Sequence, residues 1–499
     1  MQKGRTTHAT GLRRAGNDPE MATQHPIKRR SRRSKWVLTG SALATLAVLN
    51  PACGTNTSPS HFDAGAPALS DATTGGADGL AFDTGPACNG EFECAVPQCE
   101  DGKTTTLTGT VYDPAGVNPL YNAIVYIPAT RDAALEPIIT GATCDQCATS
   151  IKNAFELVQT NAKGEFTFTR VPAGNDIPLV IQVGKWRRKI TIPTIEKCVE
   201  NRVAKGSARL PKKQSEGDMP QMAVVTGGCD PLACLFSRIG IDESEFTSPT
   251  GTGRMHVYKG EGNSTGQGEL ASGKGIAPKP ESNLWNSVAS LKRYDIALLS
   301  CECNEHEETK LPSARDNMKE FLNAGGRVFA THYHYVWLKG GKSEPNGAFE
   351  SIATWLEDGV TASDQVKFDT TFPKGQALAD WMTFVAPGEV VSNEATFVDI
   401  KANVKSVKAA ATRWIYSSGS VPDPKYISFN TPIDEPESKQ CGRGVYSDIH
   451  VSSERGDDSA IPTSCEAGAL TVQEKALEFL FFDLSSCISN EKGDPKIPH

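Results

Sequence analysis

The sequence predicts two folded domains, an antiparallel β-sandwich and then a doubly wound α/β (flavodoxin-like) domain, preceded by a disordered N-terminal signal and linker. Short alternating apolar segments separated by turn residues fill residues 104–200, a pattern typical of a sandwich. Continuous apolar runs that alternate with helical patterns fill residues 219–488, which is typical of a sheet with crossover helices. At 499 residues the chain is also too long for one ordinary core.

The net charge of −8 is distributed unevenly along the chain. Residues 1–35 carry ten Lys or Arg and two acids, so the remainder carries a net charge of −16. A body this acidic offers no electrostatic footprint for nucleic acid, and we expect no such partner. Fourteen cysteines are typical of an exported protein with disulfides.

An export signal is predicted over residues 1–53, with Met21 as an alternative start. The basic stretch 29–35 precedes an apolar run, 36–49, that is shorter than the ~20 residues a spanning helix needs. The letters A-C-G around Cys53 resemble the lipobox of bacterial lipoproteins, which implies that Cys53 is acylated and attaches the chain to a membrane. Ordinary cleavage that leaves Cys53 as a spare thiol is the alternative. The expected location is extracytoplasmic, either lipid-anchored or secreted.

A flexible linker and a Cys-rich segment are predicted over residues 54–103. Ser, Thr, Ala, Gly and Asp dominate up to residue 87, so this part cannot bury enough apolar surface to fold. Cys88, Cys94 and Cys99 follow within a dozen residues. Disulfides are the expected fate of these three, with a metal knuckle as the alternative.

Four motifs in the sandwich region occur in the order of a known family. They are GTVYDPAG (Gly109–Gly116), NAIVY (Asn122–Tyr126), NAKGEFTF (Asn161–Phe168) and VPAG (Val171–Gly174). Together they resemble the carboxypeptidase regulatory-like, transthyretin-like domain. The resemblance implies a non-catalytic β-sandwich over residues 104–200.

Two cysteines in this region, Cys144 and Cys147, have the spacing of a redox pair. A redox cysteine needs a helix N-terminus to lower its pKa, whereas these two lie in a loop between predicted strands. We therefore expect a structural disulfide here, with Cys198 as a candidate partner. The basic and Pro-containing segment 201–218 marks the domain boundary.

The α/β domain is organised around residues 294–338. A buried strand, 295–299, leads through a loop rich in Cys, Glu and His to an amphipathic helix, a Gly-Gly stop and a second buried strand, 327–331. Because parallel sheets of this kind bind ligands at the carboxyl ends of their strands, we expect a site in the loops that follow these two strands.

Other elements of the α/β domain are predicted from the same signals. They are a strand at 222–226, a helix that begins with Asp230 as N-cap and Pro231, a strand at 255–258, a helix carrying Phe349, Ile352 and Leu356, a strand at 426–429, a helix after the capping box Thr471–Glu474, and a tail at 489–499. Cys229 and Cys234 are close enough to pair, and Cys441, Cys465 and Cys487 are expected to stabilise this half.

Two segments of this domain resemble a second family. NAGGRVFATH (Asn323–His332) and CGRGVYSDIH (Cys441–His450) are similar to strands of the trehalose-utilisation (ThuA-like) branch of the class I glutamine amidotransferase-like fold. Amidotransferases use a Cys in a G-x-C-x-G elbow and a Glu two residues after the late His, and this chain has neither, so we expect no ammonia-generating activity. The pair of domains also resembles exported proteins of a myxobacterial type.

Eight residues are candidates for the site at the strand ends: Cys301, Glu302, Cys303, His306, His332, His334, Asp448 and His450. Zinc is the metal that such ligands suit, with His332, His334 and His450 as its candidate ligands. A Cys–His hydrolase would use Cys301 or Cys303 as nucleophile with His332 or His450. Glu302, His306 and Asp448 complete the candidate ligand-binding set. A histidine that merely caps the strand end is the alternative for His332.

Removal of Cys53 would leave thirteen cysteines, so at least one is expected to be unpaired. The sequence thus favours an exported, surface-tethered binding or structural protein without catalytic activity, whose α/β domain holds a ligand, with a cell-surface glycan or protein as its expected partner. An exported hydrolase or metal-dependent enzyme is the alternative.

Overall fold

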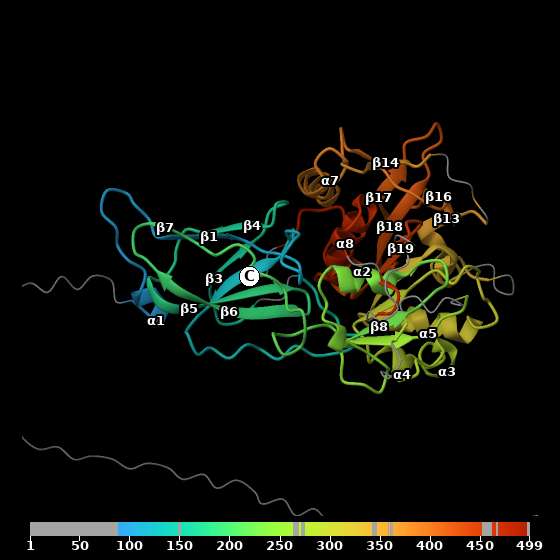
Figure 1. Ribbon diagram of the computed structural model, residues 1–499, viewed down its shortest axis with the longest axis horizontal. Helices are drawn as coiled ribbons and strands as arrows, with labels where there is room; N and C mark the ends of the chain where they lie inside the picture. Colours follow the sequence, from blue (N-terminus) through green and yellow to red (C-terminus); the bar gives the residue numbers. More distant parts are fainter. Residues whose placement is uncertain are drawn as a thin grey trace, which may run out of the picture. The chain divides into compact units, whose positions relative to one another are not determined.

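The structure is a computed structural model that describes residues 88–147, 151–262, 269–270, 275–341, 347–357, 359, 363–451, 462–465 and 468–496 (Figure 1). The predicted signal with Cys53, and the linker as far as residue 87, lie outside these residues. All described residues belong to one compact unit that begins at Asp83. No helix in the described part of the chain is long and apolar enough to cross a membrane.

Seven strands form two small sheets in the first half of the unit. They are β1 (Thr106–Thr110), β2 (Ile124–Pro128), β3 (Ala154–Gln159), β4 (Glu165–Phe168), β5 (Gly174–Val183), β6 (Trp186–Ile195) and β7 (Glu200–Arg202). The sheet β3-β2-β5-β6 is antiparallel throughout, as predicted. In the sheet β4-β1-β7, β4 pairs antiparallel with β1 but β7 pairs parallel with it, which the prediction of a purely antiparallel region missed.

A ten-stranded mixed sheet, in the order β15-β14-β17-β18-β19-β12-β11-β8-β10-β9, dominates the second half. Its strands are β8 (Met222–Val225), β9 (Phe246–Thr247), β10 (Met255–Tyr258), β11 (Ile296–Leu299), β12 (Arg327–Thr331), β14 (Gln365–Phe368), β15 (Glu394–Thr396), β17 (Thr412–Ser417), β18 (Pro424–Thr431) and β19 (Gly442–Ser447). The strands from β9 to β19 in this order run parallel, and β18, β17, β14 and β15 extend the sheet with antiparallel pairs. The parallel strands predicted from the apolar runs are confirmed, and the antiparallel half was not foreseen.

Both faces of the parallel strands are covered by helices, because alternate strand residues point to opposite sides. Val224 and Leu298 pack in one core with α2 (Leu232–Arg238), α7 (Pro373–Val385) and α8 (Val472–Ser485). The neighbouring residues in each strand pack in a second core with α4 (Val288–Leu291) and α5 (Pro312–Asn323). The domain is thus a layered α/β structure.

The shorter elements complete the architecture. They are α1 (Glu91–Cys94), α3 (Pro280–Asn283), α6 (Val336–Lys339), the two-stranded sheet of β13 (Ala353–Trp355) and β16 (Val404–Val407), and 3-10 helices at Glu243–Glu245, His332–Tyr335, Glu350–Ile352 and Glu437–Lys439. The helix predicted through Phe349, Ile352 and Leu356 is wrong. Its apolar spacing is that of a short 3-10 turn followed at once by β13.

Six disulfides join segments of the described chain: Cys88–Cys94, Cys99–Cys198, Cys144–Cys441, Cys147–Cys487, Cys229–Cys303 and Cys234–Cys465. The expected structural role of Cys144 and Cys147 holds, but neither pairs with Cys198. The predicted Cys229–Cys234 pair is wrong, because α2 carries Cys234 away from the loop that holds Cys229. Cys301 is the free cysteine of the described residues.

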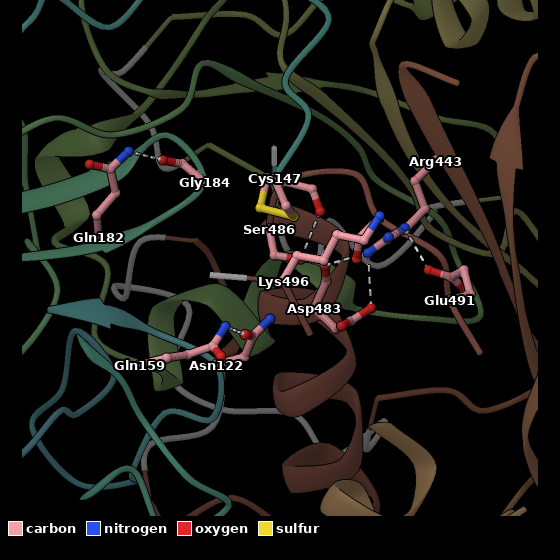
Figure 2. Close-up of a disulfide and its surroundings, with 12 residues drawn as sticks. Asn122, Cys147, Gln159, Gln182, Gly184, Arg443, Asp483, Ser486, Glu491 and Lys496 are labelled. Atoms are coloured by element: carbon pink, nitrogen blue, oxygen red, sulfur yellow. Dashed lines mark hydrogen bonds and ion pairs between the residues drawn. A yellow bond between two sulfur atoms is a disulfide. The ribbon is translucent and has the colours of Figure 1, made fainter. Parts of the chain in front are cut away.

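The loop of Cys144 and Cys147 docks on the α/β domain. Besides its two disulfides, the backbone of Cys147 donates to the carbonyl of Ile488 at 3.0 Å, and the Gln146 side chain donates to the carbonyl of Ser438 at 2.8 Å. Figure 2 shows the Cys147 disulfide close to the C-terminal end of α8. On α8, Phe481 packs edge-on against Trp186 of β6, with 6.4 Å between the ring centroids. The two halves therefore share one core.

A pair of buried carboxyl groups lies in this shared core. Glu478 on α8 is fully buried beside Asp113, which lies between β1 and β2, and its Oε2 accepts a hydrogen bond from Asn118 Nδ2 at 2.6 Å. Burial, and then the negative charge of Asp113, raise the pKa of Glu478 well above its usual value. Glu478 therefore keeps its proton in the folded chain at pH values at which the unfolded chain releases it.

Glu478→Gln should make the folded chain more stable at pH 8, on the order of 1 kcal/mol. When folding raises the pKa of a carboxyl group, the free energy of unfolding falls as the pH rises above the ordinary pKa of 4.5. The amide of Gln does not titrate, so the variant does not lose this stability. Denaturant unfolding at pH 4 and pH 8 measures the effect, with the exposed Glu243→Gln as control. Equal stability of variant and wild type at both pH values would contradict the account.

Candidate functional site

The residues that follow three of the parallel strands lie together at one edge of the sheet. Cys301 follows β11, His332 follows β12 directly, and His450 follows β19. In the parallel register, Leu299 lies beside Ala330, and Thr331 lies beside Ser447, so the three chain segments leave the sheet at the same level. One ligand atom from each of Cys301, His332 and His450 lies within 4.8 Å of the other two.

Cys301 is fully buried, and its Sγ lies 3.2 Å from Nδ1 of His332. The loop after β8 passes so closely that a Cβ on Gly227 would lie 2.1 Å from the carbonyl oxygen of Cys301, so this position requires glycine. The same carbonyl accepts the backbone N–H of Cys229 at 3.1 Å. The backbone of Cys301 is thus held by the loop that follows β8.

His332 lies at a sharp turn from β12 into a 3-10 helix, with φ at +42°. A residue with a Cβ rarely adopts this conformation, because the conformation destabilises the folded chain by roughly 1–3 kcal/mol. Such strained residues are found mostly at functional positions. Burial, and then the positive charge of His450, lower the pKa of His332 to about 3. His332 is therefore a neutral imidazole, the form that binds metal ions.

His450 is 2% exposed, and neither of its ring nitrogens has a hydrogen-bond partner among the described residues. Its Nδ1 lies 3.7 Å from Oδ2 of Asp399. Burial alone would lower the pKa of His450, but Asp399, Cys301 and Asp230 together raise it to about 10. His450 is therefore an imidazolium at ion-pair distance from Asp399, and a metal ion that binds its ring would displace this proton.

Asp230 is a further acid at this edge that no sequence motif marked as part of the site. The helix that follows has Pro231 as its N-cap, so Asp230 does not cap it as predicted. Its Oδ1 accepts the backbone N–H of Val451 at 3.0 Å, while its buried Oδ2 has no partner among the described residues. Burial raises the pKa of Asp230, and the charge of His450 opposes this rise. Its position shortly after the end of β8 was the available signal.

Glu302 and His334 belong to a separate buried network next to the cluster. Glu302 Oε2 pairs with Lys310 Nζ at 2.6 Å, and both side chains are 1% exposed. His334 Nε2 donates to the carbonyl of Ser300 at 2.7 Å, and its Nδ1 accepts from Trp337 at 3.1 Å. Because both nitrogens of His334 are occupied, His334 is not available as the metal ligand that the sequence predicted. Burial lowers its pKa to about 4, so it is neutral.

The other three candidates also serve the loops around the cluster. Cys303 is bonded to Cys229 and cannot be a nucleophile. His306 is paired with Glu308 on the loop surface at 3.0 Å. Asp448 accepts the Tyr446 hydroxyl at 2.8 Å and the backbone N–H of Asn403 at 2.8 Å, which holds the segment that follows Asp399.

Comparisons with known proteins add little to this description. No family model and no curated protein matches the chain. Among solved structures, a crystal structure titled as a ThuA-like protein from Bacteroides uniformis superposes with 8% sequence identity and a TM-score of 0.31, over 55% of this chain and 95% of that protein. Such a loose likeness carries no argument about function, so the fold assignment rests on the strand order and register. The disulfides indicate an extracytoplasmic protein.

Proposed function

We propose that the chain is an exported binding protein whose α/β domain holds a transition-metal ion, with zinc as the first choice, through Cys301, His332 and His450. The observation that carries this proposal is the convergence of one thiol and two imidazoles from three strands within 4.8 Å. Thiolate and imidazole are the ligands that zinc prefers, at about 2.3 Å and 2.0–2.1 Å from the metal. Small shifts of the three side chains would bring their ligand atoms around one ion.

The surroundings support a metal ion over a larger ligand. Cys301 and His450 are 0% and 2% exposed, so neither side chain presents a surface to which a sugar could bind. The unpaired Oδ2 of Asp230 could complete a tetrahedral set, and Asp399 beside Nδ1 of His450 would leave Nε2 free as the ligand atom. Carboxylates that orient metal-binding histidines in this way are common.

An exported Cys–His hydrolase is the second candidate, favoured by the 3.2 Å contact between Cys301 Sγ and His332 Nδ1. A nucleophile must reach its substrate, however, and the Cys301 side chain is fully buried. His332, with a pKa of about 3, is a poor acceptor of the thiol proton, and His450, whose pKa is about 10, is the better base of the two. The burial of the thiol is what favours metal binding over hydrolysis.

The finer expectations from the sequence remain part of the proposal. In this account, Cys53 is acylated and tethers the mature chain at the cell surface, the sandwich is a transthyretin-like spacer, and the α/β domain derives from the ThuA-like branch of the amidotransferase-like fold. What supports them is the set of motifs in the sequence, together with the disulfides of an extracytoplasmic chain.

The mature chain should bind one zinc ion per molecule in a calorimetric titration. His450→Ala and Cys301→Ser should each weaken binding by more than about 100-fold, because each removes a ligand, and Asp399→Asn should weaken it by about 10- to 100-fold. The control is His306→Ala, since His306 lies on the same rim outside the cluster. Equal loss in His306→Ala and His450→Ala, or no binding by the wild type, would refute the proposal.

A further inference from the structure

A hollow of about 550 Å³ opens on the α/β domain beside β16 and the start of β17, outside the Cys301 cluster. Its volume lies within the roughly 300–1,000 Å³ typical of ligand sites. Four cationic side chains line it: Lys405, Lys408, Arg413 and Lys492. Asp369 is its one acidic lining residue. We call this the cationic hollow.

The negative charge of Asp369 is already paired with a cation inside the hollow. Its Oδ2 lies 2.8 Å from Nε and 2.7 Å from Nη2 of Arg413, and its Oδ1 accepts the Thr371 hydroxyl at 2.7 Å. Burial opposes ionisation of Asp369, yet Thr371 and Arg413 hold its pKa below the usual value. Asp369 and Arg413 therefore neutralise each other.

The three lysines have no carboxylate partner in the described part of the chain. Lys408 Nζ donates to the carbonyl of Glu350 at 3.0 Å, and Lys492 Nζ donates to that of Ala409 at 3.3 Å. Lys405 is exposed and forms no ion pair among the described residues. Three uncompensated positive charges in one concave site, on a chain of net charge −8, create a local field that attracts anions.

Features beside the lysines indicate a sugar rather than a bare ion. Three residues that carry hydroxyl groups, Thr371, Ser406 and Thr412, also line the hollow. Lys408 also borders a second hollow of about 330 Å³, but that hollow is lined by Glu350 and Glu357 as well as by Trp355 of β13, so it is less suited to an anion. The indole of Trp355 already stacks on Tyr335, with 6.1 Å between the ring centroids, and packs edge-on against Tyr446 at 5.1 Å. The proposed sugar site is therefore the cationic hollow itself, with its volume, its cations and its hydroxyl-bearing residues.

We propose that the cationic hollow binds an acidic oligosaccharide, with its carboxylate or sulfate groups facing Lys405, Lys408 and Lys492. An exported protein encounters such polymers outside the cell. Nucleic acid is disfavoured, because the acidic chain repels a long polyanion away from the hollow. This site is independent of the proposed metal cluster, so either proposal can fail without the other.

Calorimetry with the mature full-length chain in EDTA tests the proposal. Tetragalacturonate and a chondroitin sulfate tetrasaccharide are the carboxylate and sulfate probes, and maltotetraose, inorganic phosphate and a single-stranded oligonucleotide are the comparisons. We expect at least one acidic tetrasaccharide to bind, and Lys405→Glu/Lys408→Glu to weaken it by about tenfold or more. Lys197→Glu/Lys319→Glu, which makes the same charge change at two exposed positions outside the hollow, should leave binding unchanged.

Several results would overturn the proposal. The first is that neither acidic tetrasaccharide binds. The second is that maltotetraose or phosphate binds as tightly as the two acidic tetrasaccharides do. The third is that the oligonucleotide binds more tightly than both acidic tetrasaccharides. Equal weakening by Lys197→Glu/Lys319→Glu and by Lys405→Glu/Lys408→Glu would also contradict it, since that would trace binding to overall charge. Circular dichroism of both variants establishes that they are folded before the comparison.

Discussion

Replacing Cys144 and Cys147 together by serine should lower the free energy of unfolding by more than any other change to the disulfides. The two bridges of this loop close segments of 297 and 340 residues. A disulfide stabilises mainly by restricting the unfolded chain, and the effect grows with the logarithm of the loop length. The bridges that close the longest segments are therefore expected to stabilise the fold most.

The chain segments that the two disulfides close overlap, and this overlap determines how much stability is lost when one disulfide alone is removed. With Cys144–Cys441 intact, Cys147–Cys487 closes an effective loop of only about fifty residues, so its loss alone should cost about 2–4 kcal/mol. Loss of both bridges should cost roughly twice as much. Guanidinium unfolding of the mature chain measures each value.

The control for this prediction is the Cys88–Cys94 bridge, whose sequence separation is six residues. Replacing Cys88 and Cys94 together by serine should cost less than either single loss in the docking loop, about 2 kcal/mol. A Cys144→Ser/Cys147→Ser variant that unfolds at the same midpoint as the wild type would show that the loop does not tie the two halves together.

The second large effect is expected at Asp483 on α8, in the buried ion network that Figure 2 shows beside the Cys147 disulfide. Asp483 Oδ1 pairs with Lys374 at 2.8 Å, and its Oδ2 pairs with Arg443 at 3.1 Å. Lys374 and Arg443 are 1% and 0% exposed. Asp483→Ala should lower the free energy of unfolding by about 3–5 kcal/mol, because it removes the carboxylate that pairs with these two buried cations.

A graded series separates this cause from loss of packing. Arg443 keeps its second partner, Glu491, at 2.7 Å, whereas no other carboxylate pairs with Lys374 among the described residues. Lys374→Met should therefore cost less than Asp483→Ala, since Asp483 keeps Arg443. Asp380→Ala, at an exposed position of α7, should cost no more than about 0.5 kcal/mol. A cost for Asp483→Ala as small as that of Asp380→Ala would contradict the role of the network.

The sequence predicted much of the α/β fold because its signals are local. The apolar runs before Cys301 and His332 are β11 and β12, and the capping box Thr471–Glu474 begins α8 as predicted. The rule that parallel strands end at a common edge then placed His450 near Cys301, although the two are about 150 residues apart. This step needed no knowledge of side-chain contacts.

The rest of the site depends on contacts that no local pattern encodes. The choice of His332 and His334 as ligands of one zinc ion required a regular strand, but β12 ends at Thr331 and the positive φ of His332 turns the chain into a 3-10 helix. Lys310 is the buried partner of Glu302 only because the loop folds back on itself. Asp399 comes from a loop without any motif.

The disulfide pairing could not be predicted for the same reason. Partners are up to 340 residues apart, and pairing requires that the folded chain bring two Cα atoms within about 7 Å. The count of cysteines was informative, since an odd number after Cys53 predicted an unpaired thiol, and the described residues leave Cys301 in that state.

The most direct test of the proposed metal cluster is X-ray absorption at the zinc edge on the mature chain loaded with one equivalent of zinc. The account predicts one sulfur ligand at about 2.3 Å and nitrogen or oxygen ligands at about 2.0–2.1 Å, with two imidazoles among them. In Cys301→Ser, the sulfur shell should disappear. A shell of oxygen and nitrogen alone in the wild type, or the same sulfur shell in Cys301→Ser, would contradict the account.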